Sequence, residues 1–120
     1  AIGSKIAIMG LTFKENCPDL RNTKIVSIKE YLDECNCIVD VVDPYADAKQ
    51  AREIFGIDLI DVDLIKGYEA IILAVQHDKY LKIKKSQWLK MIKPNGVLVD
   101  VKSIYPIEMF SNEPITHWRL

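Results

Sequence analysis

Short apolar runs alternate with amphipathic or polar stretches along the whole chain. Five of these runs have the length of a strand and are apolar almost throughout, which is typical of strands buried on both faces of a parallel sheet. We expect strands over residues 5–9, 38–42, 57–60, 70–75 and 97–101. The less regular tail after Pro106 is expected to pack onto the body of the domain.

Helical periodicity fills the stretches between these runs. Apolar side chains at spacings of three and four indicate an amphipathic helix after the first run; they are Ile25, Ile28, Leu32 and Cys35. A second helix is expected over residues 46–55, with Gly56 as its left-handed terminator. A third is expected over Gln87–Ile92, capped by Ser86.

The alternation of strands and helices predicts an α/β fold in one domain, residues 1–120. We expect a Rossmann-like open parallel sheet of five or more strands, in the order 3-2-1-4-5, with helices on both faces. Ligands of such sheets bind outside the carboxyl ends of the strands, at the switch point between strands 1 and 4. The loops that reach this edge are residues 10–22, 43–46, 76–80 and 102–105.

Charge and cysteine content narrow the functional class. Sixteen basic and seventeen acidic side chains give a net charge of −1, which argues against a nucleic-acid or membrane-surface partner. Three cysteines, an odd number, disfavour a disulfide framework and favour a reducing compartment, so we expect a cytoplasmic protein. The start Ala1-Ile2-Gly3-Ser4, without Met, predicts a piece of a longer protein that holds further parts of the chemistry.

The loop after the first run offers cations but lacks a dinucleotide fingerprint. A G-x-G-x-x-G motif would let the backbone approach a pyrophosphate, and only Gly10 is present, so the chain should not bind NAD by itself. Lys14 and Arg21 flank a helix N-terminus, where a phosphate is the natural ligand. The alternative is that both cations are solvated or pair with Glu15 and Asp19.

Other reactive side chains have simpler interpretations. Cys17 has no histidine near it in the sequence, so it is expected to be a bystander, and the spacing of Cys35 and Cys37 predicts no metal site. Asp43 could bind a ribose, but with the glycine loop missing a turn or a helix cap is favoured. His77 could contact a ligand or act as a base, or it could cap a helix or bond a neighbour.

The segment GLTFKENCPDLRNT, residues 10–23, resembles the C-terminal UDP-binding domain of the UDP-glucose/GDP-mannose dehydrogenase family. The sequence of this segment is most similar to that of the bacterial branch of the family, whose enzymes act on UDP-N-acetylhexosamines, as in the biosynthesis of Vi polysaccharide. The resemblance spans about residue 4 to residue 120. Later segments that agree with it are Val42-Asp43-Pro44, Ile72-Leu73-Ala74-Val75-Gln76-His77-Asp78, Val99-Asp100-Val101-Lys102 and Trp118-Arg119-Leu120.

The resemblance implies an enzyme that oxidises the C6 alcohol of UDP-N-acetylglucosamine or UDP-N-acetylgalactosamine to the uronic acid, for bacterial surface polysaccharide. It implies an N-terminal domain that binds NAD, a helical linker that dimerises, and a nucleophilic cysteine, all outside this chain. By motif match, Phe13, Lys14 and Lys102 would contact the UDP-sugar and Arg21 would reach the NAD. The chain alone should therefore be inactive and mostly monomeric, and the whole enzyme a homodimer or larger.

Two other functions fit the same pattern of residues. One is a Rossmann-shaped regulatory or interaction module without a ligand, and the other is a small nucleotide-binding protein that is complete in itself. Titration with UDP and UDP-sugar separates the three, because a module does not bind, a complete protein binds tightly, and a domain cut from an enzyme binds weakly.

Overall fold

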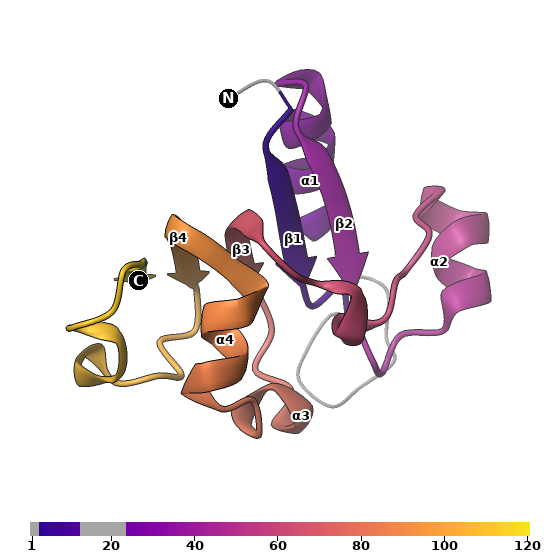
Figure 1. Cartoon of the computed structure of the whole chain (residues 1–120). Coiled ribbons are helices and arrows are strands. Elements are labelled where there is room, and N and C mark those ends of the chain that lie inside the picture. The colour runs from indigo at the N-terminus through magenta and orange to yellow at the C-terminus, as the bar shows by residue number, and fades with distance from the viewer. Residues whose placement is uncertain (1–2, 13–23) are drawn as a thin grey trace.

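The computed structural model describes residues 3–12 and 24–120, and within them five parallel strands form one sheet (Figure 1). The order across the sheet is β2-β1-β3-β4-β5, and every neighbouring pair is parallel. The switch point lies between β1 and β3, because the chain leaves β1 toward β2 on one side and returns to β3 on the other. The strands are β1 (Lys5–Met9), β2 (Ile38–Val42), β3 (Tyr68–Leu73), β4 (Ile92–Asp100) and β5 (Thr116–Arg119).

The strand order confirms the predicted 3-2-1-4-5 arrangement, with β3 and β4 as the expected fourth and fifth strands. The expectation of a full strand over residues 57–60 is wrong. This segment lies beside β2 as predicted, but it makes a single bridge, Val41 with Leu59. The chain turns away after that pair, because Asp61 caps the short 3-10 helix η1 (Val62–Leu64). The tail, expected to be irregular, supplies β5 along the edge of β4.

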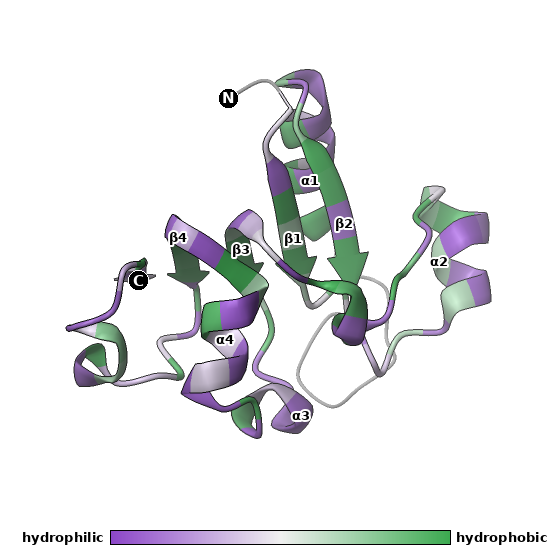
Figure 2. Ribbon diagram, in the orientation of Figure 1, coloured by the Kyte–Doolittle hydropathy of each residue, from purple (hydrophilic) through white to green (hydrophobic). Residues whose placement is uncertain are grey.

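Helices cover the sheet on both faces, as predicted, and each face has its own core (Figures 1 and 2). Helices α1 (Lys24–Glu34) and α2 (Ala48–Phe55) enclose one core through Ile25 and Ala51. The other core contains side chains of α3 (Asp78–Leu81), α4 (Lys85–Met91) and the 3-10 helix η2 (Ile107–Phe110). Figure 2 shows hydrophobic residues concentrated in the strands between these layers. None of the described helices has both the length and the hydropathy to cross a membrane.

Helix ends follow local chemistry, with two corrections. Gly56 ends α2 at φ +68°, which confirms the predicted left-handed terminator. Ser86 does not cap α4; the helix starts two residues earlier than expected, at Lys85, and the Gln87 side chain accepts a hydrogen bond from the Lys84 amide at 2.8 Å. The expected stripe on α1 is only partly buried, because Ile25 is in the core while Cys35 is exposed.

Gly10 brings the end of β1 close to β3 at the switch point. Its φ is +116°, which L side chains rarely adopt, and an added Cβ would lie 2.7 Å from the Cβ of Val75. The Gly10 amide donates to the Val42 carbonyl at 2.8 Å. The residue therefore fixes how closely the ends of β1, β2 and β3 approach one another.

We expect Gly10→Ala to reduce the free energy of unfolding by about 2–4 kcal/mol, through overpacking against Val75 and a strained φ. Gly67→Ala is the matched control, since Gly67 also has a positive φ (+66°) but nothing lies within 4 Å of its added Cβ. It should cost only the conformational part, about 1 kcal/mol. Urea unfolding of both variants measures the difference, and equal losses would contradict the close contact.

Candidate functional site

One buried carboxylate joins the carboxyl ends of β1 and β2. Asp43, directly after β2, is 6% exposed. Its Oδ2 accepts hydrogen bonds from the amides of Leu11 and Thr12 at 2.7 and 3.0 Å. Its Oδ1 accepts from the amides of Tyr45 and Ala46 at 2.8 and 3.1 Å. The carboxylate therefore fixes both the first residues of the loop after β1 and the turn after β2.

His77 brings the loop after β3 into the same network. Its Nε2 lies 3.0 Å from Asp43 Oδ2 and 3.2 Å from Thr12 Oγ1, and both His77 and Thr12 are fully buried. The imidazole packs against the rings of Tyr45 and Tyr80, with centroids 4.6 and 5.3 Å away. An ionised carboxylate can only accept, so His77 Nε2 donates to Asp43. Three loops of the switch point are thus held at one place.

The hydrogen bonds keep Asp43 ionised despite its burial. Burial alone raises the pKa of the Asp43 carboxyl, but hydrogen bonds from His77 and from the amides of Leu11, Thr12 and Tyr45 outweigh it and hold the pKa below its ordinary 3.8. Tyr80 responds in the opposite way, because burial first and the charge of Asp43 second raise the pKa of its hydroxyl. The Tyr80 hydroxyl stays protonated and donates to the Val42 carbonyl at 3.2 Å.

The network confirms the favoured interpretation of Asp43 as the centre of a turn. Both of its carboxylate oxygens are bound by protein donors, so the ribose grip of a dinucleotide fold is not open to it. His77 bonds a neighbour, as one of its expected roles, and its side chain does not cap α3. The sequence did not point to Thr12. The available signal was that Thr12, Asp43 and His77 each follow a strand that ends at the switch point.

The predicted ligand-binding residues are divided between described and undescribed parts of the chain. Phe13, Lys14 and Arg21 lie outside the described residues, and so does Cys17. The structure does place Lys102, which is exposed in the turn after β4. Because all strands are parallel, this turn and Thr12 both lie at the carboxyl ends of the strands.

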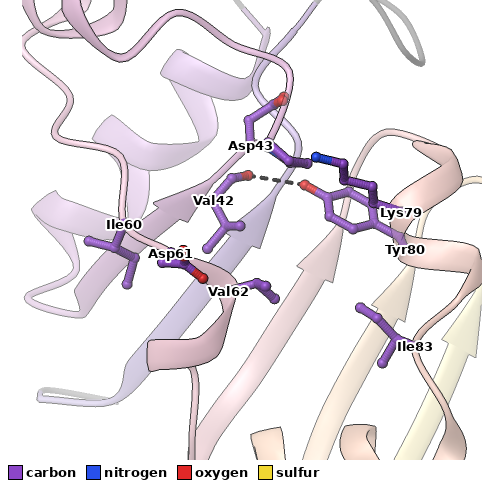
Figure 3. A pocket seen from close by; sticks show the side chains of 9 residues that line it. Val42, Asp43, Ile60, Asp61, Val62, Lys79, Tyr80 and Ile83 are labelled. Carbon is purple, nitrogen blue, oxygen red and sulfur yellow. Dashed lines mark hydrogen bonds between the residues drawn. The ribbon is translucent and has the colours of Figure 1, made fainter.

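A cavity of about 440 Å³ lies beside the network, between the end of β2, η1 and α3 (Figure 3). Its volume is within the range of small-molecule sites. Lys79 contributes a cation, 5.4 Å above the centroid of the Tyr45 ring. The walls are largely apolar, and their charged groups are the Lys79 ammonium and the carboxylates of Asp43 and Asp61, so the charge of the lining does not select an anionic ligand. The residues that line it are Val42, Asp43, Pro44, Ile60, Asp61, Val62, Lys79, Tyr80 and Ile83.

The described residues gather no metal-binding cluster. In the segments 3–12 and 24–120, no three side chains of His, Cys, Asp or Glu are grouped so that they could hold a metal ion. The histidines that the structure places are each engaged with a buried aspartate, His77 with Asp43 and His117 with Asp100. The aspartate of each pair also accepts hydrogen bonds from backbone amides of the neighbouring turns.

A family model and individual relatives place the chain in the same protein family. The sequence model of the UDP-glucose/GDP-mannose dehydrogenase family, UDP binding domain, matches residues 7–107. The chain is 43% identical over 102 residues to protein CapL of Staphylococcus aureus, covering 85% of this chain and 24% of CapL. It is 41% identical over 108 residues to UDP-N-acetyl-D-glucosamine 6-dehydrogenase of Salmonella typhi, covering 88% of this chain and 25% of that protein. The chain thus spans about a quarter of the length of the curated relatives it matches.

Solved structures share the fold. NDP-N-acetyl-D-galactosaminuronic acid dehydrogenase from Methanosarcina mazei Go1 superposes with a TM-score of 0.84 at 24% identity, over 98% of this chain and 24% of that one. UDP-N-acetyl-mannosamine dehydrogenase Cap5O from S. aureus gives a TM-score of 0.70 at 21% identity, over 98% of this chain and 26% of that one. At these identities the likeness establishes the fold alone.

Proposed function

The chain belongs to the UDP-glucose/GDP-mannose dehydrogenase family as its UDP binding domain, and from that premise we propose that it is the C-terminal, nucleotide-sugar-binding domain of an NAD-dependent UDP-sugar 6-dehydrogenase. The proposed substrate is UDP-N-acetylglucosamine or UDP-N-acetylgalactosamine, oxidised to the uronic acid for bacterial surface polysaccharide in the cytoplasm. Its partners are the UDP-sugar and the rest of its own polypeptide, which forms a homodimer or larger assembly. The match over residues 7–107 carries this proposal.

Phe13, Lys14 and Lys102 contact the UDP-sugar in this proposal. Lys14 neutralises charge on the diphosphate, and Phe13 forms a wall of the pocket. Two observations support the assignment. Thr12, the residue before Phe13, is anchored at the switch point by Asp43, and Lys102 is exposed on the same edge of the sheet.

This domain lacks the features with which a dinucleotide-binding domain holds NAD. The loop after β1 has a single glycine where three are needed, and Asp43 is committed to backbone amides and His77. We therefore assign NAD to the N-terminal domain of the full-length enzyme, with Arg21 reaching toward it from this domain. The planar guanidinium of arginine suits a pyrophosphate, which it can bind through two parallel hydrogen bonds. The nucleophilic cysteine is likewise assigned to a region outside this chain.

Titration of the 120-residue chain with UDP by calorimetry tests the proposal. We expect weak but saturable binding, because only part of the ligand's surface is contacted, and no NADH formation with UDP-N-acetylglucosamine and NAD. Lys14→Ala should weaken binding further. Lys90→Ala is the control, since Lys90 is exposed just before β4 at the opposite edge of the sheet.

Other outcomes of this titration favour the rival functions. No heat of binding at millimolar UDP would favour an interaction module without a ligand. Tight binding by the chain alone would favour a small nucleotide-binding protein that is complete in itself.

A further inference from the structure

A second buried carboxylate shapes the turn that carries Lys102. Asp100, the last residue of β4, is fully buried, and its two oxygens accept from the amides of Ile104 and Tyr105, each at 3.0 Å. The Ser103 amide donates to the Asp100 carbonyl at 3.2 Å. These bonds close the turn that contains Lys102, and Lys102 itself is exposed.

The last strand, β5, holds this turn from the edge of the sheet. His117 Nε2 lies 3.0 Å from Asp100 Oδ2, with side-chain exposures of 4% and 0%. The Ser103 hydroxyl donates to the Leu120 carbonyl at 2.5 Å. Arg119 adds a longer bond, from Nη2 to the Ser103 carbonyl at 3.4 Å. Both Asp100 and Ser103, on either side of Lys102, are therefore tied to β5.

His117 makes its bond to Asp100 at a cost. Its Nε2 donates to the carboxylate, and its Nδ1 is buried without a hydrogen-bond partner among the described residues. The ring packs edge-on against Phe110, with centroids 5.1 Å apart. A phenylalanine could keep that packing and leave no unpaired ring nitrogen, so what the histidine adds is the hydrogen bond that orients Asp100.

We infer that His117 is a positioning residue: by bonding Asp100 it fixes the turn that presents Lys102 to the diphosphate of the UDP-sugar. The inference rests on the proposed function, because it requires Lys102 to contact that ligand. Strand β5 thereby contributes to substrate binding indirectly, through Asp100 and the turn that carries Lys102. Since Lys102 binds the substrate and its transition state alike, a displaced turn should change KM and leave kcat nearly constant.

Steady-state kinetics of the full-length enzyme with UDP-N-acetylglucosamine test this role. His117→Phe should raise KM roughly 3- to 10-fold, the loss of part of one charge-assisted contact, with kcat within twofold. His117→Gln, whose amide nitrogen can replace Nε2 as the donor, should restore KM to within about twofold of the wild type. Thr116→Val is the control on the same strand, because Thr116 is exposed, and it should leave both constants unchanged.

A double-mutant cycle separates positioning from a general structural effect. If His117 acts through Lys102, His117→Phe should add nothing to the KM increase of Lys102→Ala. Multiplying effects would overturn the inference, as would a normal KM for His117→Phe when Lys102→Ala raises it. A normal KM for Lys102→Ala itself would overturn the role of Lys102 and the inference with it. If His117→Phe does not fold, His117→Asn, too short to reach Asp100, is held to the same expectations.

Discussion

Lys14→Ala should lower kcat/KM for the UDP-sugar by roughly 10- to 150-fold in the full-length enzyme, and leave the NAD requirement almost unchanged. The reason is the loss of one charge-assisted hydrogen bond to the diphosphate, worth about 1.5–3 kcal/mol, at about 1.4 kcal/mol for each tenfold. Arg21→Ala should show the reverse, with a raised KM for NAD. Arg21→Lys should recover little, because an ammonium cannot form the two parallel bonds of a guanidinium.

The two variants test each other. Steady-state kinetics with each ligand varied in turn should give opposite patterns for Lys14→Ala and Arg21→Ala, and Lys90→Ala should match the wild type. A surface cation without a ligand costs less than about 1 kcal/mol when removed. Both variants staying within about threefold of the wild type for both ligands would mean that the roles taken from the family motif are wrong.

Asp43→Ala should reduce the free energy of unfolding by about 3–5 kcal/mol and lower Tm by roughly 10–20 °C. The substitution leaves four amides and the His77 imidazole without the acceptor they now share. The bonds from Leu11, Thr12 and His77 are buried, so these donors have no water to replace the lost acceptor. Asp58→Ala is the matched control, since Asp58 is exposed and pairs with Arg52 on the surface; it should cost less than about 1 kcal/mol. Equal losses in the two variants would contradict the network.

The same carboxylate should make stability depend on acid pH. The pKa of Asp43 is lower in the folded chain than its ordinary 3.8, so its contribution is complete above that value and is lost as pH falls toward the folded pKa. Chemical unfolding of the wild type and of Asp43→Asn between pH 6 and pH 2 measures this. The difference in stability between them should be constant in the upper part of the range and shrink below about pH 4. A difference that does not change with pH would show that the carboxylate is not stabilised in the folded state.

The sequence by itself determined the central sheet and the class of the domain. The segments 5–9 and 38–42 are apolar enough to require burial on both faces, and they form β1 and β2 with those bounds. Gly56 ends α2 because few other residues adopt its positive φ. The motif over residues 10–23 identified the family, which the match over residues 7–107 bears out. These features are local, so a pattern along the chain can specify them.

Only the tertiary structure decided which polar side chains meet. Strand β5 has no apolar pattern because it lies at the edge of the sheet, where Trp118 is 55% exposed, and pairing with β4 is what makes it a strand. Thr12, Asp43 and His77 are separated by more than thirty residues along the chain, yet they share hydrogen bonds in one buried place. Their meeting depends on the crossover connections that bring three strand ends to one edge of the sheet. Side chains so far apart in sequence carry no local signal of contact, because the free energy of their hydrogen bonds exists only after the chain has closed around them.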